Sequence, residues 1–198
     1  TLLVEESDSE RQKKLSAIHR QAMRAHEMIA DLMLFARPPK LALAPCNLTE
    51  LVQQWGEQWN ELADEHNARV EVECPSKPVE VAVDATQLSI AVRALIVNSL
   101  QATGEGGQIN ISLRQFEFDD RPTAEIVVRD NGPGFSDMVR RHIFDPFFSG
   151  REAGRGLGFG LSKCWRIVTE HGGQVIVQRL NYGTEISILL PLKSSVSR

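Results

Sequence analysis

The sequence has 198 residues, of which 42% are hydrophobic and 24% are charged, and this composition is typical of a soluble globular protein. Lys and Arg number 22 against 26 Asp and Glu, giving a net charge of −4 without a basic stripe. A direct nucleic-acid contact is therefore not expected. No apolar run approaches the roughly 18 residues of a membrane-spanning helix, so no membrane contact is expected either. The cysteines have no metal-ligand spacing, which favours free thiols in a cytoplasmic protein; they are Cys46, Cys74 and Cys164.

A long helix is predicted over residues 10–36, which contain neither Gly nor Pro. Its apolar residues are spaced alternately by three and four positions, as in a coiled coil. We call this stripe the seam; its members are Leu15, Ile18, Ala22, Ala25, Ile29, Leu32 and Ala36. A single helix cannot bury such a stripe, so we expect a partner, which is a second helix outside this sequence, a second copy of the chain, or both; homodimerisation is therefore a hypothesis. Pro38 and Pro39 end the helix.

After this break, helix and strand patterns alternate, which indicates an α+β domain. Helices are predicted from Asn47 to about Leu62, from Asp84 to Thr103 and from Gly160 to His171. Period-two alternation predicts strands at 70–74 and 79–83, on either side of a Pro75–Pro78 turn, and at 109–113, 124–130, 174–178 and 184–190. We expect a two-layer sandwich with a mixed, mostly antiparallel sheet and helices on one face. The predicted domains are 1–44, a helical segment, and 45–198. Because the sequence begins with Thr1 in mid-pattern, we expect it to be part of a longer protein.

A glycine-rich loop follows the predicted strand at 124–130. It reads Asp130-Asn131-Gly132-Pro133-Gly134. Glycines let a backbone approach a ligand closely, and a carboxylate accepts hydrogen bonds from an exocyclic amine such as that of adenine. Asp-Asn-Gly is also a common turn sequence, so the motif alone leaves an ordinary turn open.

A second glycine cluster, Gly154-Arg155-Gly156-Leu157-Gly158-Phe159-Gly160, ends where a helix begins. Exposed backbone N–H groups and the helix N-terminus suit phosphate binding. Neither the dinucleotide fingerprint nor the P-loop matches it, and a flexible hinge is the alternative. Upstream lies Phe144-Asp145-Pro146-Phe147-Phe148, an aromatic loop that predicts a lid over a ligand, with Arg151 and Arg155 near phosphates. An ordinary loop anchored in the core is the alternative.

Asn98 lies on the predicted helix from Asp84 to Thr103, which otherwise buries apolar residues on one face. Its amide oxygen is suited to complete the ligand shell of a Mg²⁺ ion that phosphates already hold. A surface position without a ligand is the alternative for Asn98.

Five features together resemble, in their order and spacing, the catalytic ATP-binding domain of sensor histidine kinases. They are Asn98, the Asp130 loop, the aromatic lid, the glycine cluster and Gly183-Thr184. The resemblance covers about Pro45–Leu192, and it implies the Bergerat-type ATP-binding fold of the gyrase, chaperone, histidine kinase and mismatch-repair ATPases. The helix before Pro38 resembles the second helix of that family's dimerisation and phosphotransfer hairpin.

The resemblance implies that Asn98 is a Mg²⁺ ligand and that the Asp130 carboxylate recognises adenine. It also implies that Thr184 supports the hydrogen bonds around adenine. Gly132 and Gly134 would form the floor under the base. The lid residues implied to face ATP are Phe147, Arg151, Gly154, Arg155, Gly156, Leu157, Gly158 and Gly160. The implied activity is transfer of the ATP γ-phosphate to a histidine, for relay to an aspartate of a response-regulator receiver domain.

Several positions depart from the family pattern. No His-Glu/Asp-x-x-Asn-Pro motif occurs, and His26 lacks the Asn-Pro, so the phosphoacceptor is expected outside this sequence. The other four histidines are interpreted as structural or surface residues; they are His19, His66, His142 and His171. Ser99 replaces the usual Ala, and Ser149-Gly150-Arg151 replaces a Thr-Thr-Lys-like ending, which leaves the γ-phosphate contact open between Arg151 and Arg155.

Three rival functions stay open at this point. Ala94 provides no carboxylate base for water, which argues against an ATP-driven machine of the gyrase or chaperone kind and favours phosphoryl transfer. The seam helix argues against a serine-kinase anti-sigma factor. The complete glycine clusters argue against a degenerate nucleotide-binding module.

Overall fold

The computed structural model describes residues 9–36, 40–146, 148, 158–180 and 182–192. It divides into two compact units, with the boundary between Pro39 and Lys40. Within the described part of the chain, no helix has both the length and the apolar content that crossing a membrane requires.

The first unit contains one helix, α2 (Ser9–Ala36). It confirms the helix expected from the Gly- and Pro-free stretch. Seam residues Ile18 and Ile29 are 65% and 60% exposed, and the nearby Met33 is 66% exposed. Large apolar side chains on this helix therefore stay accessible within the single chain.

The second unit begins with β1 (Ala44–Asn47), α3 (Leu48–Asp64), β2 (Arg69–Glu73) and β3 (Glu80–Val83). The helix α4 (Ala85–Thr103) and the hairpin of β4 (Gln108–Phe118) and β5 (Arg121–Asp130) follow. The unit ends with α5 (Asp137–His142), α6 (Gly160–Glu170), β6 (Gln174–Arg179) and β7 (Thr184–Pro191).

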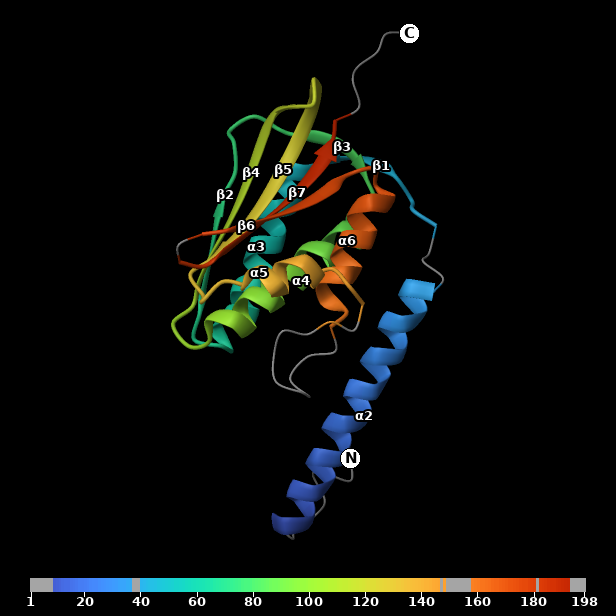
Figure 1. The fold of residues 1–198 in the computed structure, drawn as a ribbon, viewed down its shortest axis with the longest axis vertical. Helices are drawn as coiled ribbons and strands as arrows, with labels where there is room; N and C mark the ends of the chain where they lie inside the picture. The colour runs from blue at the N-terminus through green and yellow to red at the C-terminus, as the bar shows by residue number, and fades with distance from the viewer. Residues whose placement is uncertain (1–8, 37–39, 147, 149–157, 181, 193–198) are drawn as a thin grey trace. The chain divides into compact units, whose positions relative to one another are not determined.

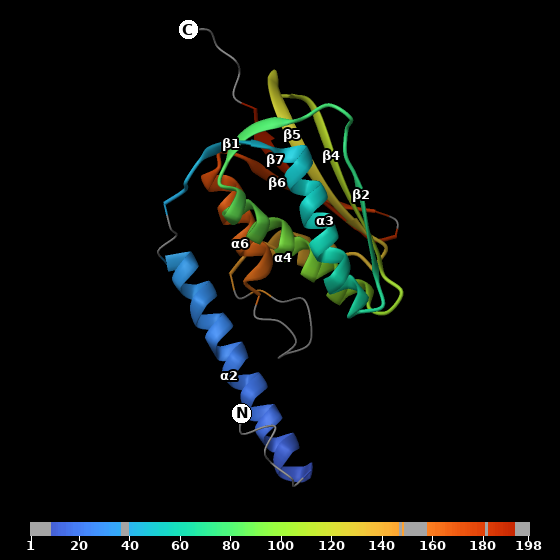
Figure 2. The same ribbon diagram turned by 180° about the vertical axis from the view of Figure 1, so that it is seen from behind.

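Five strands form one sheet in the order β2-β4-β5-β7-β6. Only the β2–β4 pair is parallel, and the other three pairs are antiparallel. Helices α3, α4 and α6 lie against one face of this sheet (Figures 1 and 2). The predicted two-layer arrangement with a mixed, mostly antiparallel sheet is confirmed.

Three features of the fold were not predicted. Strand β1 pairs with β3 in a separate two-stranded sheet, and the short helix α5 begins at the Ser136 cap. The strands on either side of Pro75–Pro78 do not pair with each other, because β2 joins β4 and β3 joins β1. Four-residue elements carry too little periodicity to reveal a partner that is distant in sequence.

The core lies between the helices and the sheet. Alternate strand residues such as Ile111, Ile126 and Ile188 are fully buried because successive side chains of a strand point to opposite faces. They meet the buried stripe of α4, which includes Leu88 and Leu95. This packing fixes α4 over β4 and β5.

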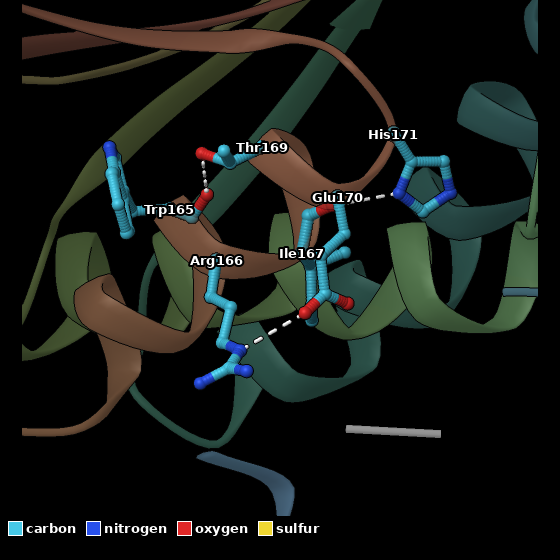
Figure 3. Close-up of polar contacts among 6 residues, drawn as sticks. All are labelled: Trp165, Arg166, Ile167, Thr169, Glu170 and His171. Atoms are coloured by element: carbon cyan, nitrogen blue, oxygen red, sulfur yellow. Dashed lines mark hydrogen bonds and ion pairs between the residues drawn. The ribbon is translucent and has the colours of Figure 1, made fainter. Parts of the chain in front are cut away.

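A buried histidine links the ends of two helices. At the C-terminal end of α6, the Nδ1 atom of His171 lies 2.8 Å from the Ile167 carbonyl oxygen, as Figure 3 shows. The backbone N–H of Asp84, the N-cap of α4, donates to the other ring nitrogen at 3.0 Å. This arrangement fits the neutral tautomer with its proton on Nδ1, and it gives His171 a structural role. The link holds the start of α4, the helix that carries Asn98, against the end of α6.

Candidate functional site

The candidate site is built around Asp130, the last residue of β5, which is 4% exposed. Its Oδ1 atom accepts hydrogen bonds from the backbone N–H of Gly132 at 2.9 Å and of Thr184 at 3.2 Å. Its Oδ2 atom accepts from the Ser99 hydroxyl at 3.0 Å. A carboxylate has about four acceptor positions. These three bonds therefore leave about one acceptor position, on Oδ2, for a donor from outside.

Two opposing effects act on the charge of this carboxyl group. Burial raises the pKa of Asp130, and the hydrogen bonds from Gly132, Ser99 and Thr184 lower it in part. Burial disfavours the charged form, whereas donors aimed at the oxygens stabilise it. The charge of this group therefore depends on the balance between its burial and these donors.

Close backbone packing locks the loop after Asp130 to the turn before β7. A Cβ atom on Gly183 would lie 1.8 Å from the Asp130 carbonyl oxygen, and one on Gly134 would lie 2.9 Å from the Gly183 carbonyl oxygen. Both glycines also have positive φ angles, +88° and +74°, which side-chain-bearing residues rarely adopt. Gly132 is tight as well, since its Cβ would lie 3.0 Å from Oδ1 of Asp130. The loop and the turn form a rigid support for the carboxylate.

Helix α4 forms the other side of the site. Ser99, which contacts Asp130, is 3% exposed, and Thr184, which pairs with Asp130 from the neighbouring strand β7, is also 3% exposed. Asn98 precedes Ser99 and is half-buried. The structure thus brings Asp130, Gly132, Gly134 and Thr184 together, and Asn98 is the neighbour of Ser99 on the helix that contacts them.

The Ser99 contact is the feature that sequence reasoning missed. Ser99 stood out only as a departure from the family pattern. A stronger signal was available: Ser99 follows Leu88, Val92 and Leu95 on the apolar stripe of α4. A polar side chain on a buried face requires a hydrogen-bond partner.

Most of the predicted lid lies outside the described residues. Phe147, Arg151, Gly154, Arg155, Gly156 and Leu157 belong to this group. Of the remaining lid residues, Gly158 has a φ of +70° and Gly160 begins α6. The N-cap of α6 is Phe159, which makes no side-chain cap hydrogen bond. Backbone N–H groups at such a helix start suit a phosphate group.

The aromatic segment before the lid has a local anchor at the end of α5. His142 pairs with Asp145, with Nδ1 and Oδ2 2.7 Å apart, and its ring centroid lies 5.6 Å from that of Phe148. Phe148 is half-buried. The histidine therefore has a partner that the sequence alone did not indicate.

The donor set fits a Mg²⁺ ion that a nucleotide helps to hold. Within the described ranges, no three His, Cys, Asp or Glu side chains come together as a metal site. Asn98 directly precedes Ser99 on α4 and carries one amide oxygen, and Mg²⁺ at phosphate sites is usually held by a few protein oxygens together with phosphates and water.

A separate cavity of about 370 Å³ shares Asp130 and Asn131 with this site. Its other lining residues include Arg69, Asn110 and Arg129. These three alternate along their strands with the buried core residues, so they lie on the sheet face away from the helices. The cavity therefore lies against the far side of the Asp130 loop from α4.

Comparison with known proteins agrees with this geometry. Residues 83–194 match the family model described as histidine kinase-, DNA gyrase B- and HSP90-like ATPase. The chain belongs to this family of ATPases, and its predicted likeness to the catalytic domain of sensor histidine kinases is confirmed.

One relative is the alginate biosynthesis sensor protein KinB of Pseudomonas aeruginosa, which is 30% identical over 83% of this chain and 28% of its own length. The chain thus spans well under half of the curated relatives that it matches. The solved catalytic domain of histidine kinase ThkA is 26% identical, with a TM-score of 0.66, over 76% of this chain and 95% of that one. ThkA in complex with the response regulator TrrA shares the fold, at 22% identity and a TM-score of 0.79, over 97% of this chain and 54% of that chain.

Proposed function

We propose that this chain is the ATP-binding catalytic part of a two-component sensor histidine kinase. It binds ATP and transfers the γ-phosphate to a histidine, from which the phosphate passes to an aspartate of a response-regulator receiver domain. The observation that carries the proposal is the buried Asp130 carboxylate with about one unfilled acceptor position, held by Ser99, the residue that follows Asn98 on α4. The free acceptor position of Asp130 is suited to an exocyclic amine, and the amide oxygen of Asn98 is suited to a metal ion that a phosphate also holds.

Each predicted site residue then has a defined task. Asp130 accepts a hydrogen bond from the adenine amine, and Thr184 holds Asp130 in place through its backbone N–H. Gly132 and Gly134 bring the loop backbone under the base. The lid residues cover the phosphates; they are Phe147, Arg151, Gly154, Arg155, Gly156, Leu157, Gly158 and Gly160.

Asn98 is the residue that would hold Mg²⁺, which supplies positive charge to the phosphate oxygens when bound. Catalysis in such a site consists mainly of positioning the γ-phosphate and neutralising its charge. Ala94 lies one turn before Asn98 and offers no base to activate water. The absence of a carboxylate there favours transfer to a histidine over ATP hydrolysis.

The chain is proposed to act as a homodimer in the cytoplasm. Residues 1–44 form part of the dimerisation and phosphotransfer region, and residues 45–198 form the catalytic domain. The exposed seam on α2 supports dimerisation. Free cysteines fit a reducing compartment, and burial raises the pKa of the Cys164 thiol to about 12. No histidine of this chain has the phosphoacceptor motif, so the acceptor is assigned to a separate segment.

Asp130→Asn tests the adenine contact. Asn keeps one carbonyl oxygen for Gly132 and Thr184 and places an NH₂ group toward the adenine amine, so we expect the fold to remain and nucleotide binding to be lost. Calorimetric titration with ADP and with ATP in the presence of Mg²⁺ measures this. Asp64→Asn makes the same change at an exposed site and should bind normally. Tight adenine-nucleotide binding by Asp130→Asn would overturn the assignment.

The reaction is tested with γ-labelled ATP and the phosphotransfer hairpin of a sensor histidine kinase as acceptor. We expect acid-labile, base-stable label on the hairpin and no self-labelling of this chain. Acid-stable label would point to serine-kinase chemistry instead.

A further inference from the structure

The Ser99 hydroxyl is the only side chain among the described residues that hydrogen-bonds to the Asp130 carboxylate. Backbone N–H groups make both other bonds, and both go to Oδ1. Ser99 and Asp130 lie 31 residues apart in sequence, and both are buried. The oxygen with an unfilled acceptor position is thus the one that Ser99 holds.

We propose that Ser99 is a positioning residue for base recognition, which keeps Asp130 in its acceptor form and aims the remaining acceptor position of Oδ2 at the 6-position of the base. This inference rests on the proposed function, because it assumes that Asp130 meets the base of a bound nucleotide.

The carboxyl group of Asp130 has two protonation states, and they differ in their hydrogen bonding. An ionised carboxylate only accepts hydrogen bonds, whereas a protonated one also donates. The ionised form suits the 6-amino group of adenine. The protonated form suits a 6-carbonyl group, such as that of hypoxanthine. The proton on Asp130 therefore decides which base the pocket prefers.

Among the groups around Asp130, Ser99 is the side chain whose replacement would change the pKa of this carboxyl group. Burial raises the pKa of Asp130, and the Ser99 bond is one of three contacts that lower it. Within the described residues, no charged side chain is bonded to Asp130. Its neighbours Arg129 on β5 and Glu185 on β7 alternate with buried residues and lie on the opposite sheet face. On α4, the nearest charged residue, Arg93, is exposed, and β4 contributes Gln108 and Ile109 at this end of the sheet.

Ser99→Ala in the full chain is the direct test. The variant loses one donor to a buried carboxylate, so we expect about tenfold weaker ATP binding at pH 7. Because the missing bond had lowered the pKa of Asp130, the pH below which ATP binding fails should move upward. The preference for ATP over inosine triphosphate, which carries a 6-carbonyl, should fall as well. Titration calorimetry between about pH 5 and 8 measures all three quantities.

Ser187→Ala is the matched control. Ser187 on β7 is also buried, at 1% exposure, but its hydroxyl has no hydrogen-bond partner among the described residues. The same chemical change there should leave ATP affinity, its pH midpoint and the ATP preference unchanged. Thermal unfolding of both variants shows whether a loss of binding reflects a loss of fold.

The outcomes separate this inference from the proposed function. If wild-type protein binds ATP and Ser99→Ala keeps the wild-type pH midpoint and ATP preference, the role of Ser99 is overturned and the proposed function stands. If wild-type protein binds no nucleotide, the proposed function and base recognition by Asp130 both fail. The titration of Asp130 by carboxyl-carbon NMR in nucleotide-free protein then still tests whether Ser99 controls its proton: an upward shift in Ser99→Ala supports this, and no shift contradicts it.

Discussion

At the scale of single residues, Gly183 allows the close backbone packing on which the candidate site depends. Its backbone lies against the Asp130 carbonyl so closely that an added Cβ would overlap the oxygen at 1.8 Å. The same turn leads into Thr184, whose N–H donates to the Asp130 carboxylate. Backbone proximity at Gly183 therefore fixes the carboxylate that the proposed function uses.

Gly183→Ala should lower the free energy of unfolding by about 3 kcal/mol or more, because the Cβ overlaps backbone that cannot move aside cheaply. Gly106→Ala is the matched control, since Gly106 has a similar φ of +75° but nothing within 4 Å of its Cβ position. We expect it to lose about 1–2 kcal/mol from backbone strain alone. Urea unfolding of both variants gives the comparison. Equal losses would show that the φ angle, rather than the contact with Asp130, accounts for the effect.

At the scale of elements, the N-terminus of α4 matters because this helix carries Asn98 and Ser99 to the site. Asp84 caps it, with the Gln87 N–H donating to Oδ1 at 3.0 Å. The Ala42 N–H donates to Oδ2 at 3.0 Å, and His171 accepts from the Asp84 N–H. One residue thereby joins the start of α4 to α6 and to the segment before β1.

The Gln87 and Ala42 hydrogen bonds hold the pKa of Asp84 below its usual value, against a smaller opposing effect of burial. A carboxyl group whose pKa is lower in the folded state stabilises the protein above its unfolded pKa, about 3.9, and this stabilisation is lost as the pH falls through the folded value.

Asp84→Ala should therefore cost about 1 kcal/mol at pH 7 through loss of the cap. Its deficit relative to wild type should shrink below about pH 4. Asp84→Asn keeps a capping oxygen without the charge and should lose less at pH 7. Chemical denaturation at pH 7 and pH 3 measures these differences. A deficit in Asp84→Ala that stays constant with pH would contradict the role of the charge.

At the scale of the whole molecule, the exposed apolar residues of α2 are the main feature that the single chain does not account for. Ile18 and Ile29 are both seam residues, and each is more than half exposed. A helix cannot bury its own stripe, so an apolar seam of this length is suited to a second copy of the chain.

Replacing both isoleucines, Ile18→Asp and Ile29→Asp together, should convert a dimer into a monomer, because a dimer would bury the new charges. Light scattering after gel filtration of the full chain measures the mass. Ala17→Asp introduces the same side chain at an exposed position off the seam and should remain dimeric. A wild-type protein with the mass of one chain would reject the dimer outright.

The sequence by itself determined the elements that depend on local pattern. The Gly- and Pro-free stretch predicted α2, the Asn47 and Asp84 caps predicted the starts of α3 and α4, and alternation predicted β4 and β5. The order of the motifs also indicated the family. These features could be predicted because capping and side-chain periodicity act between residues only a few positions apart.

Tertiary structure alone decided the contacts that make the site. The Ser99–Asp130 bond spans 31 residues and the Thr184–Asp130 bond spans 54, and the pairing of β1 with β3 depends on a register that short strands do not encode. Such contacts arise only when the core between α4 and the sheet forms and brings distant backbone together. The sequence could therefore name Asp130, but only the packing of α4 against β5 showed that Ser99 holds it.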